Sequence, residues 1–240
     1  MKHIDRNMKA KIRLNSEKII LRNNMINILK MSSLVMLISL ISTYFVLRVV
    51  YEAGAFSISL DPNLAKKSGL IMYERLEEKL ERKILKATKV DFMDNISVDW
   101  LPENLNTIGE GSHNGDNYLA YSFYVENKGS DSINYWYKVV IDDVIKNVDK
   151  AIRVMIYKND EKTIYGKINE ETGEPEPGTK SFYSNQNVLL ELREGFKPGD
   201  IDKFTIVIYI EGNDPDCIDE LIGGEMKMHM EITEVQIEQQ

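Results

Sequence analysis

The sequence predicts a mainly β protein, an antiparallel β-sandwich that follows a single transmembrane helix. Three observations lead to this class. Residues 31–50 form an apolar run as long as a bilayer is thick. After residue 95, apolar residues alternate with polar ones in several short segments, and Gly, Pro, Asn and Asp separate these segments. The composition, 43% hydrophobic and 28% charged over 240 residues, excludes a disordered chain, and the lone cysteine excludes an internal disulfide framework.

The charged residues divide the chain into three regions. The whole chain has 30 Lys and Arg against 38 Asp and Glu, which gives a formal net charge of −8. The first thirty residues hold eight basic and two acidic side chains, whereas residues 51–240 hold 21 basic and 36 acidic ones. We therefore expect a basic tail at 1–30, a transmembrane helix at 31–50 and an acidic domain at 51–240 with a net charge of −15.

The predicted transmembrane segment reads MSSLVMLISLISTYFVLRVV, and Arg48 is its only charged residue. At about 1.5 Å per residue, about twenty helical residues cross the hydrocarbon layer. The Arg48 guanidinium can reach the headgroups from near the end of the helix, and Tyr44 and Tyr51 suit the same interface. The alternative is a buried core helix, but the basic flank and the lack of a polar face favour the membrane.

The basic side of the membrane segment predicts its orientation. Lys and Arg before the span should keep the N-terminus in the cytoplasm, so we expect a cell-membrane protein with its C-terminal domain outside the cytoplasm. Ala53-Gly54-Ala55 fits a signal-peptidase site, so the alternative is secretion after cleavage near Ala55. The apolar run exceeds an ordinary signal core, which favours an uncleaved anchor. Residues 1–30 are either a solvated tail or an amphipathic helix on anionic lipid.

The first elements after the membrane are a strand and a helix. Residues 56–60 alternate large and small side chains and predict a strand that ends at Asp61-Pro62. Residues 70–89 predict an amphipathic helix, in which Glu78 and Arg82 are spaced as an i,i+4 pair. Its apolar stripe recurs at three- and four-residue spacing and consists of Tyr73, Leu76, Leu80, Ile84 and Ala87.

The remaining chain predicts the strands of the sandwich. In each, apolar residues fall on alternate positions and therefore on one face. These segments are residues 96–100, 119–127, 133–141, 152–156, 188–192, 204–210 and 226–232. An acidic, Pro-rich loop at 169–178 interrupts them. No P-loop, no Gly-rich strand-to-helix turn and no nucleic-acid module is present in the sequence, so we expect no nucleic-acid partner.

Two segments in particular carry a family resemblance, AYSFYVENKGS and IYIEGNDPDCIDELIGGEMKM. Together with GAFSISLDP and ISVDWLP, in order over residues 54–233, they resemble the camelysin and TasA-like group of exported Gram-positive proteins. The resemblance implies a jelly-roll-like sandwich at the cell surface and, in fibre-forming members, assembly by strand exchange. The chain departs from the group in its long charged N-terminus and in residues 70–89.

Because some camelysin-like proteins are described as metalloproteases, a metal-dependent surface peptidase is an alternative function. A zincin helix needs two histidines four residues apart with a glutamate beside the first, and the sequence has no such motif. His113 and His229 are the only histidines after the membrane segment, and they are far apart in sequence. A peptidase site would have to be assembled from distant residues.

The densest group of carboxylates lies between the last two predicted strands. Several acidic side chains within ten residues repel one another unless a cation or solvent screens them, and oxygen ligands suit calcium. The candidate calcium ligands are Glu211, Asp214, Asp216, Asp219 and Glu220. Pro215 and Cys217 interrupt the spacing of an EF-hand, so a solvated acidic turn is the alternative. No other cofactor is predicted.

These observations favour a membrane-anchored surface protein that acts by binding or assembly, with self-association or other surface proteins as partners. A third alternative is a transmembrane sensor in which the basic residues 1–30 contact a cytoplasmic partner.

Overall fold

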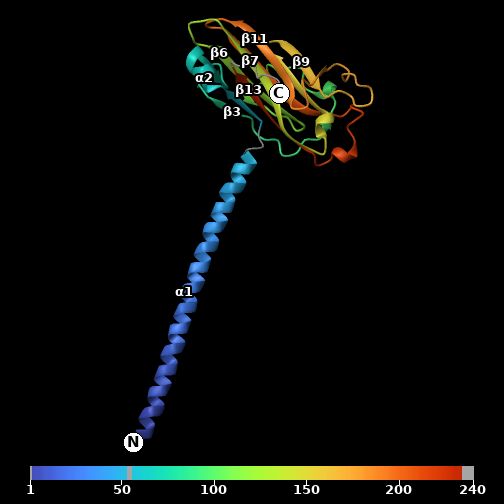
Figure 1. The fold of residues 1–240 in the computed structure, drawn as a ribbon. Coiled ribbons are helices and arrows are strands. Elements are labelled where there is room, and N and C mark those ends of the chain that lie inside the picture. Colours follow the sequence, from blue (N-terminus) through green and yellow to red (C-terminus); the bar gives the residue numbers. More distant parts are fainter. Residues whose placement is uncertain (1, 53–55, 234–240) are drawn as a thin grey trace. The chain divides into compact units, whose positions relative to one another are not determined.

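The computed structural model describes residues 2–52 and 56–233, and its contacts divide the chain into two compact units at Ala53 and Gly54 (Figure 1). The first unit is a single helix, α1 (Lys2–Glu52). The second contains all the strands.

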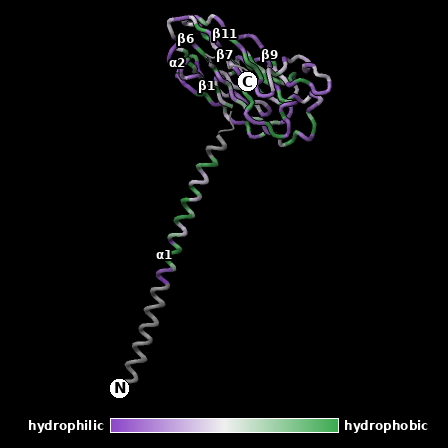
Figure 2. The backbone as a smooth tube through the Cα atoms, viewed as in Figure 1, coloured by the Kyte–Doolittle hydropathy of each residue, from purple (hydrophilic) through white to green (hydrophobic). Residues whose placement is uncertain are grey.

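Helix α1 is continuous over 51 residues, so the predicted basic tail and the predicted membrane segment belong to one helix. Its stretch Arg22–Leu47 is long and apolar enough to cross a membrane (Figure 2). None of this stretch is buried. The hydroxyls of Ser32 and Thr43 donate to the carbonyl oxygens of Leu29 (3.0 Å) and Ser39 (2.9 Å), which satisfies both hydroxyl donors within the helix. The side chains of Arg48 and Tyr51, and the tripeptide Ala53-Gly54-Ala55, lie outside the described residues.

The second unit has two β-sheets, as the mainly β prediction requires. The five-stranded sheet has the order β11–β7–β13–β1–β3. Its strands are β11 (Asn187–Phe196), β7 (Ile133–Ile145), β13 (Glu225–Thr233), β1 (Ser57–Leu60) and β3 (Ile84–Lys86). Every pairing is antiparallel except β1 with β13, where Ser57 to Leu60 run parallel to His229 to Ile232.

The eight-stranded sheet has the main order β10–β9–β8–β12–β6–β2. Its strands are β10 (Lys180–Ser181), β9 (Glu161–Gly166), β8 (Ile152–Lys158), β12 (Ile201–Glu211), β6 (Tyr118–Asn127) and β2 (Leu70–Tyr73). Two short strands complete it, because β4 (Asn95–Ile96) pairs with β12 and β5 (Gly111–Ser112) pairs with β6. β4 and β10 are parallel to their partners, so the sandwich is mostly rather than wholly antiparallel.

The main core lies between the two sheets and is built from the alternating residues that the sequence analysis identified. Phe123 of β6 stacks on Phe204 of β12 with ring centroids 5.3 Å apart, and Tyr137 of β7 meets Phe204 edge-on at 5.2 Å. Tyr137 belongs to the five-stranded sheet and Phe204 to the other, so this contact joins the two layers.

A second apolar cluster covers the outer face of the eight-stranded sheet. Leu101 and Leu105 are buried on this face, against β6, β8 and β12. The strand residues beneath them are Ala120, Met155, Tyr157, Val207 and Tyr209. β6, β8 and β12 therefore bury both of their faces, which explains why almost every residue along them is inaccessible to solvent.

The predicted helix at residues 70–89 is wrong. The segment begins as β2, which pairs with β6, and ends near β3, which pairs with β1, and a charged loop connects them. Leu70 and Met72, and likewise Leu85 and Ala87, are buried at period two, whereas Leu80 is exposed. Sheet partners at both ends outweigh the local helical spacing, and Arg75 pairs with Glu78 instead of the expected Glu78–Arg82 pair.

Two other local predictions also change. The helix of this region is α2 (Pro62–Ser68), where the Asp61 side chain accepts from the Asn63 N–H at 2.7 Å, Pro62 begins the helix and Gly69 closes it with φ +69°. The strand expected at 96–100 is only β4 followed by a 3-10 turn, η1 (Val98–Trp100). The Ser97 hydroxyl caps this turn by accepting from the Asp99 N–H.

The two ends of the sandwich differ in their connections (Figure 1). One end, called the η end here, carries η1, η2 (Val148–Lys150) and η3 (Asp219–Leu221). β7 ends there and β13 begins there, since Glu225 pairs with Ile145. The other, the α2 end, carries α2 and the turn between β6 and β7, where the Lys128 N–H donates to the Gly69 carbonyl at 3.0 Å.

Candidate functional site

The acidic loop between β12 and β13 contributes to a candidate cation site at the η end. Carboxylate oxygens of Asp214, Asp216 and Glu176 lie within 4.8 Å of one another. Asp214 and Asp216 were predicted ligands, whereas Glu176 comes from the Pro-rich loop between β9 and β10. In the part of the chain that the structure describes, this is the only group of three or more potential metal ligands.

The trio is partly neutralised by the protein itself. The Arg153 guanidinium of β8 donates to Asp214 Oδ2, and both side chains are almost completely buried. The Asp216 N–H donates to Asp214 Oδ1 at 2.7 Å, and the Asn169 amide donates to Glu176 Oε1 at 2.9 Å. Arg153 thus offsets only part of the charge of the three carboxylates, and hard oxygen ligands of this kind suit calcium.

The other three predicted ligands do not join the trio. Glu211 closes the loop instead, because its carboxylate accepts from the N–H groups of Val98 (3.1 Å) and Asn213 (3.0 Å). Asp219 and Glu220 lie in η3 and are exposed. The trio thus contains two of the five carboxylates that the sequence analysis selected.

Cys217 lies beside this loop as a free, partly exposed thiol. Its sulfur accepts a hydrogen bond from the Asn95 amide at 3.4 Å. This contact holds β4, just before η1, against the acidic loop. The hydrogen bond from the Asn213 amide to the Ser97 hydroxyl, at 2.8 Å, has the same effect.

The two histidines of the second unit lie in separate places and do not share a metal site among the described residues. The ring nitrogens of His113 face the carbonyl oxygens of Gly111 (3.0 Å) and Leu105 (3.2 Å), so His113 fixes the loop that covers the second core. His229 lies on β13, on the outer face of the five-stranded sheet.

His229 is held between two carboxylates. Its Nδ1 lies 2.8 Å from Asp142 and its Nε2 lies 2.9 Å from Glu231, and Lys138 pairs with the other oxygen of Glu231 at 2.7 Å. Partial burial opposes protonation, but the hydrogen bonds to the two carboxylates outweigh it and raise the pKa of His229. Since a carboxylate only accepts, this geometry favours an imidazolium that donates from both nitrogens.

A carboxylate also joins the two sheets at one lateral edge. Glu191 of β11 accepts from Tyr137 of β7 at 2.6 Å and from Tyr165 of β9 at 2.8 Å, and Lys180 of β10 donates to it at 2.7 Å. Although burial opposes ionisation, these three donors lower the pKa of Glu191 to about 2. Glu191 is therefore ionised at neutral pH and stabilises the closed edge.

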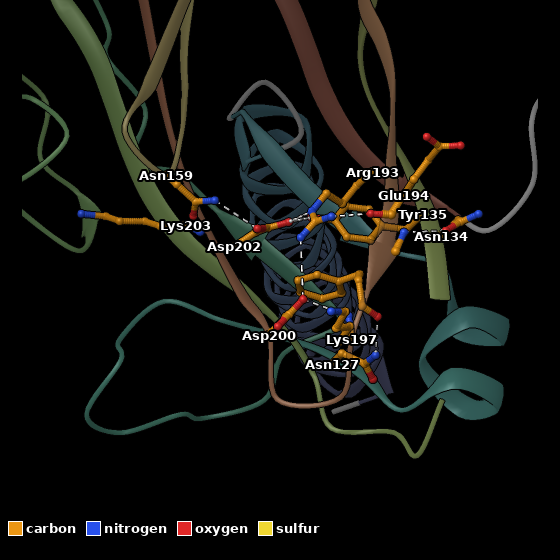
Figure 3. A network of polar contacts seen from close by, with 12 residues as sticks. Asn127, Asn134, Tyr135, Asn159, Arg193, Glu194, Lys197, Asp200, Asp202 and Lys203 are labelled. Atoms are coloured by element: carbon orange, nitrogen blue, oxygen red, sulfur yellow. Dashed lines mark hydrogen bonds and ion pairs between the residues drawn. The ribbon is translucent and has the colours of Figure 1, made fainter. Parts of the chain in front are cut away.

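A polar network around the buried Asp202 fixes the α2 end in a similar way (Figure 3). Asp202 of β12 accepts from Tyr135 at 2.6 Å, from Arg193 at 3.0 Å and from Asn159 at 3.1 Å, which ties β7 and β11 to the turn after β8. The donors of Tyr135, Arg193 and Asn159 all bond to the Asp202 carboxylate. We therefore interpret this network as a structural feature and not as a binding site.

Comparison with known proteins adds no family. No family model matches the chain, and no curated protein matches it. Two crystal structures of a β-glucosidase from Kluyveromyces marxianus share 15% sequence identity with it. The complex with glucose has a TM-score of 0.24 over 78% of this chain and 18% of that chain, and the selenomethionine-labelled form has 0.26 over 70% and 16%. The chain spans less than a fifth of those enzymes, and similarity at this level carries no functional argument.

Proposed function

We propose that the chain is a single-pass membrane protein whose acidic sandwich lies outside the cytoplasm at the cell surface and acts by binding or assembly. The observation that carries this proposal is the unburied apolar stretch Arg22–Leu47, placed between a basic N-terminal segment and a strongly acidic second unit. Charge asymmetry of this kind orients a span with its basic side in the cytoplasm.

Protease protection tests this topology. Protease added outside intact cells is expected to remove the sandwich and leave a membrane-protected N-terminal fragment. Full protection of the sandwich until the cells are lysed would contradict the proposed orientation, and release of the sandwich into the medium without protease would favour cleavage near Ala55.

The place of β1 supports assembly as the mode of action. β1 is the first strand after the helix, and it completes the five-stranded sheet by lying between β13 and β3. Its inward residues Ile58 and Leu60 are buried in the main core. The first strand of a domain can leave its own sheet and take the same place in the sheet of a second copy. This is the strand exchange that the TasA-like resemblance implies.

A disulfide across the β1–β3 pair distinguishes the two forms. Ser59 pairs with Ile84, and both lie on the outward side of the sheet. In a Cys217→Ser background, Ser59→Cys with Ile84→Cys should give a reducible ladder of linked copies if strands are exchanged. A protein that oxidises only within single chains, and that shows no filaments by negative-stain imaging, would contradict assembly by this route.

Calcium binding is a second candidate, favoured by the Glu176–Asp214–Asp216 trio. A ligand that binds only the folded state at 100 times its Kd adds about 2.7 kcal/mol to the free energy of unfolding. We expect calcium to raise the thermal midpoint of the wild-type chain and of Glu174→Gln, an exposed neighbour outside the trio, but not that of Glu176→Gln. Equal responses in all three proteins would contradict a site at the trio.

A further inference from the structure

The Pro-rich loop between β9 and β10 is exposed along most of its length but buries one carboxylate. Residues 170–175, 177 and 178 are exposed, whereas Glu176 is only 6% exposed. A loop that packs on a domain usually buries an apolar side chain, because an ionised carboxylate is costly to remove from water. The one buried side chain among residues 170–178 therefore needs a partner of opposite charge.

The protein gives Glu176 one neutral donor and two more carboxylates. The Asn169 amide donates to its Oε1 at 2.9 Å, and no Lys, Arg or His of the described residues forms an ion pair with it. Its carboxylate instead faces Asp214 and Asp216, with one oxygen of each of the three within 4.8 Å of the others. Two oxygens bound to one calcium ion at about 2.4 Å each lie at most about 4.8 Å apart, so a single ion can contact all three.

The charges in and beside the trio leave room for one divalent cation. Three ion pairs are present, and they are Arg153–Asp214, Lys150–Glu170 and Lys167–Asp149. Arg153 also donates to the Lys150 carbonyl at 3.2 Å, which joins these pairs into one cluster. Glu176 and Asp216 form no ion pair among the described residues, so two negative charges remain. Asp149 Oδ1 is also the only buried side-chain oxygen or nitrogen without a hydrogen-bond partner in the described part of the chain.

The other polar contacts of the loop, among the described residues, are exposed or internal to it. The Glu170 side chain that pairs with Lys150 is 56% exposed, and exposed ion pairs contribute little to stability. The N–H groups of Glu171 and Thr172 donate to Asn169 Oδ1 at 3.0 Å, which shapes the loop without attaching it to the sandwich. Burial of Glu176 against the two aspartates is therefore the main attachment of the loop.

We propose that calcium bound by Glu176, Asp214 and Asp216 anchors the β9–β10 loop to the loop between β12 and β13, so that the β9–β10 loop resists proteases only while the ion is bound. This inference rests on the calcium binding proposed above and adds its consequence for the loop. Without the ion, repulsion among the three carboxylates favours release of Glu176 into solvent. Release of its buried side chain frees the loop from the sandwich.

Digestion of the full chain in detergent micelles with a Glu-specific protease tests the anchoring. Glu170 and Glu171 are exposed cleavage sites in the β9–β10 loop, and the exposed Glu77, Glu78 and Glu81 between β2 and β3 are internal controls. Calcium at 100 times its Kd lowers the population of released loop about 100-fold, so cleavage after Glu170 and Glu171 should slow by up to that factor relative to a chelated sample. Cleavage at the control sites should keep its rate. Equal cleavage of the β9–β10 loop with calcium and with chelator would overturn the proposal.

Matched variants identify the anchor. Glu176→Gln should be cut rapidly in the β9–β10 loop whether or not calcium is present, while an unchanged rate at the sites between β2 and β3 shows that the sandwich is still folded. Lys150→Met removes the exposed ion pair with Glu170 and keeps the trio, so it should retain protection by calcium. Equal loss of protection in Lys150→Met and Glu176→Gln would assign the anchoring to the ion pair and contradict the proposal.

Thermal unfolding of the same samples separates failure of this inference from failure of the calcium site. A midpoint that calcium raises in the wild-type chain but not in Glu176→Gln, together with unchanged cleavage of the loop, overturns the anchoring and leaves the site intact. A wild-type midpoint that calcium does not move overturns the site, and the anchoring with it.

Discussion

The helix and the sandwich use the same apolar residue types in opposite ways. Met36 and Leu37 of α1 are 66% and 54% exposed, whereas Met72 and Leu64 of the sandwich are completely buried. The sandwich buries its side chains between two sheets, and Arg22–Leu47 has no second layer within its own unit. Residue type alone therefore does not place a side chain inside the protein. For the helix, lipid would supply the missing apolar layer under the membrane anchoring proposed above.

Truncating one apolar side chain in the sandwich and one in the helix should give the largest difference between the two regions. Phe204→Ala removes a buried ring that contacts Phe123 and Tyr137, and should lower the free energy of unfolding by about 3–5 kcal/mol. Leu40→Ala, in the exposed helix, should leave the unfolding of the sandwich unchanged. Denaturant unfolding followed by the β-sheet circular dichroism signal measures both. Equal losses would mean that the helix packs on the protein rather than on lipid.

A charged residue in the middle of α1 tests whether the exposed apolar stretch of the helix lies in lipid. Leu37→Arg should disfavour membrane insertion by about 3 kcal/mol and lower the membrane-bound fraction, while the sandwich keeps its thermal midpoint. Leu37→Ala is the control of similar helix propensity. If the two variants fractionate alike with membranes, the segment does not lie in hydrocarbon.

The alternation of apolar residues was enough to predict most long strands of the sandwich but not its short ones. β6, β7, β12 and β13 fall where the period-two pattern placed them, because each buries one face in the main core. Residues 70–89 fit two periods at once, and only their pairing with β6 and β1 decides for strands. Local spacing carries no information about such distant partners.

The candidate site shows the same limit. Asp214 and Asp216 could be selected because they are neighbours in sequence, whereas Glu176 reaches them only through the folding of the loop between β9 and β10. That loop was visible as acidic and Pro-rich, but nothing in its sequence indicated a partner. Glu211 was selected for its charge, and its hydrogen bonds to two backbone N–H groups give it a structural role instead.

The Glu191 carboxylate adds a charged contact to the apolar burial that closes the sandwich. Glu191→Gln weakens the acceptor of Tyr137, Tyr165 and Lys180, and should lower the free energy of unfolding by about 2 kcal/mol at pH 7. Because the pKa of Glu191 is depressed to about 2, its contribution is complete above the usual glutamate value of 4.5 and is lost as the pH falls towards 2. The difference between wild type and variant should therefore shrink in acid. A constant difference down to the acid transition would assign the effect to packing.

The smallest effect is expected on the open face of the five-stranded sheet. The pKa of His229 is raised, so its stabilising contribution is complete below its unfolded value of 6.5 and is lost as the pH rises through the folded value. His229→Gln should cost at most about 1 kcal/mol at pH 6 and less at pH 9. Thermal unfolding of the full chain over this range measures it. A cost that increases with pH would contradict an imidazolium between Asp142 and Glu231.

Labelling of Cys217 tests the central claim most directly, because it is the only thiol in the chain and is partly exposed in the sandwich. A membrane-impermeant maleimide added to intact cells should label the wild-type protein fully, with no increase after lysis, and Cys217→Ser should remain unlabelled. Labelling that appears only after the cells are opened would place the acidic sandwich in the cytoplasm and contradict the account.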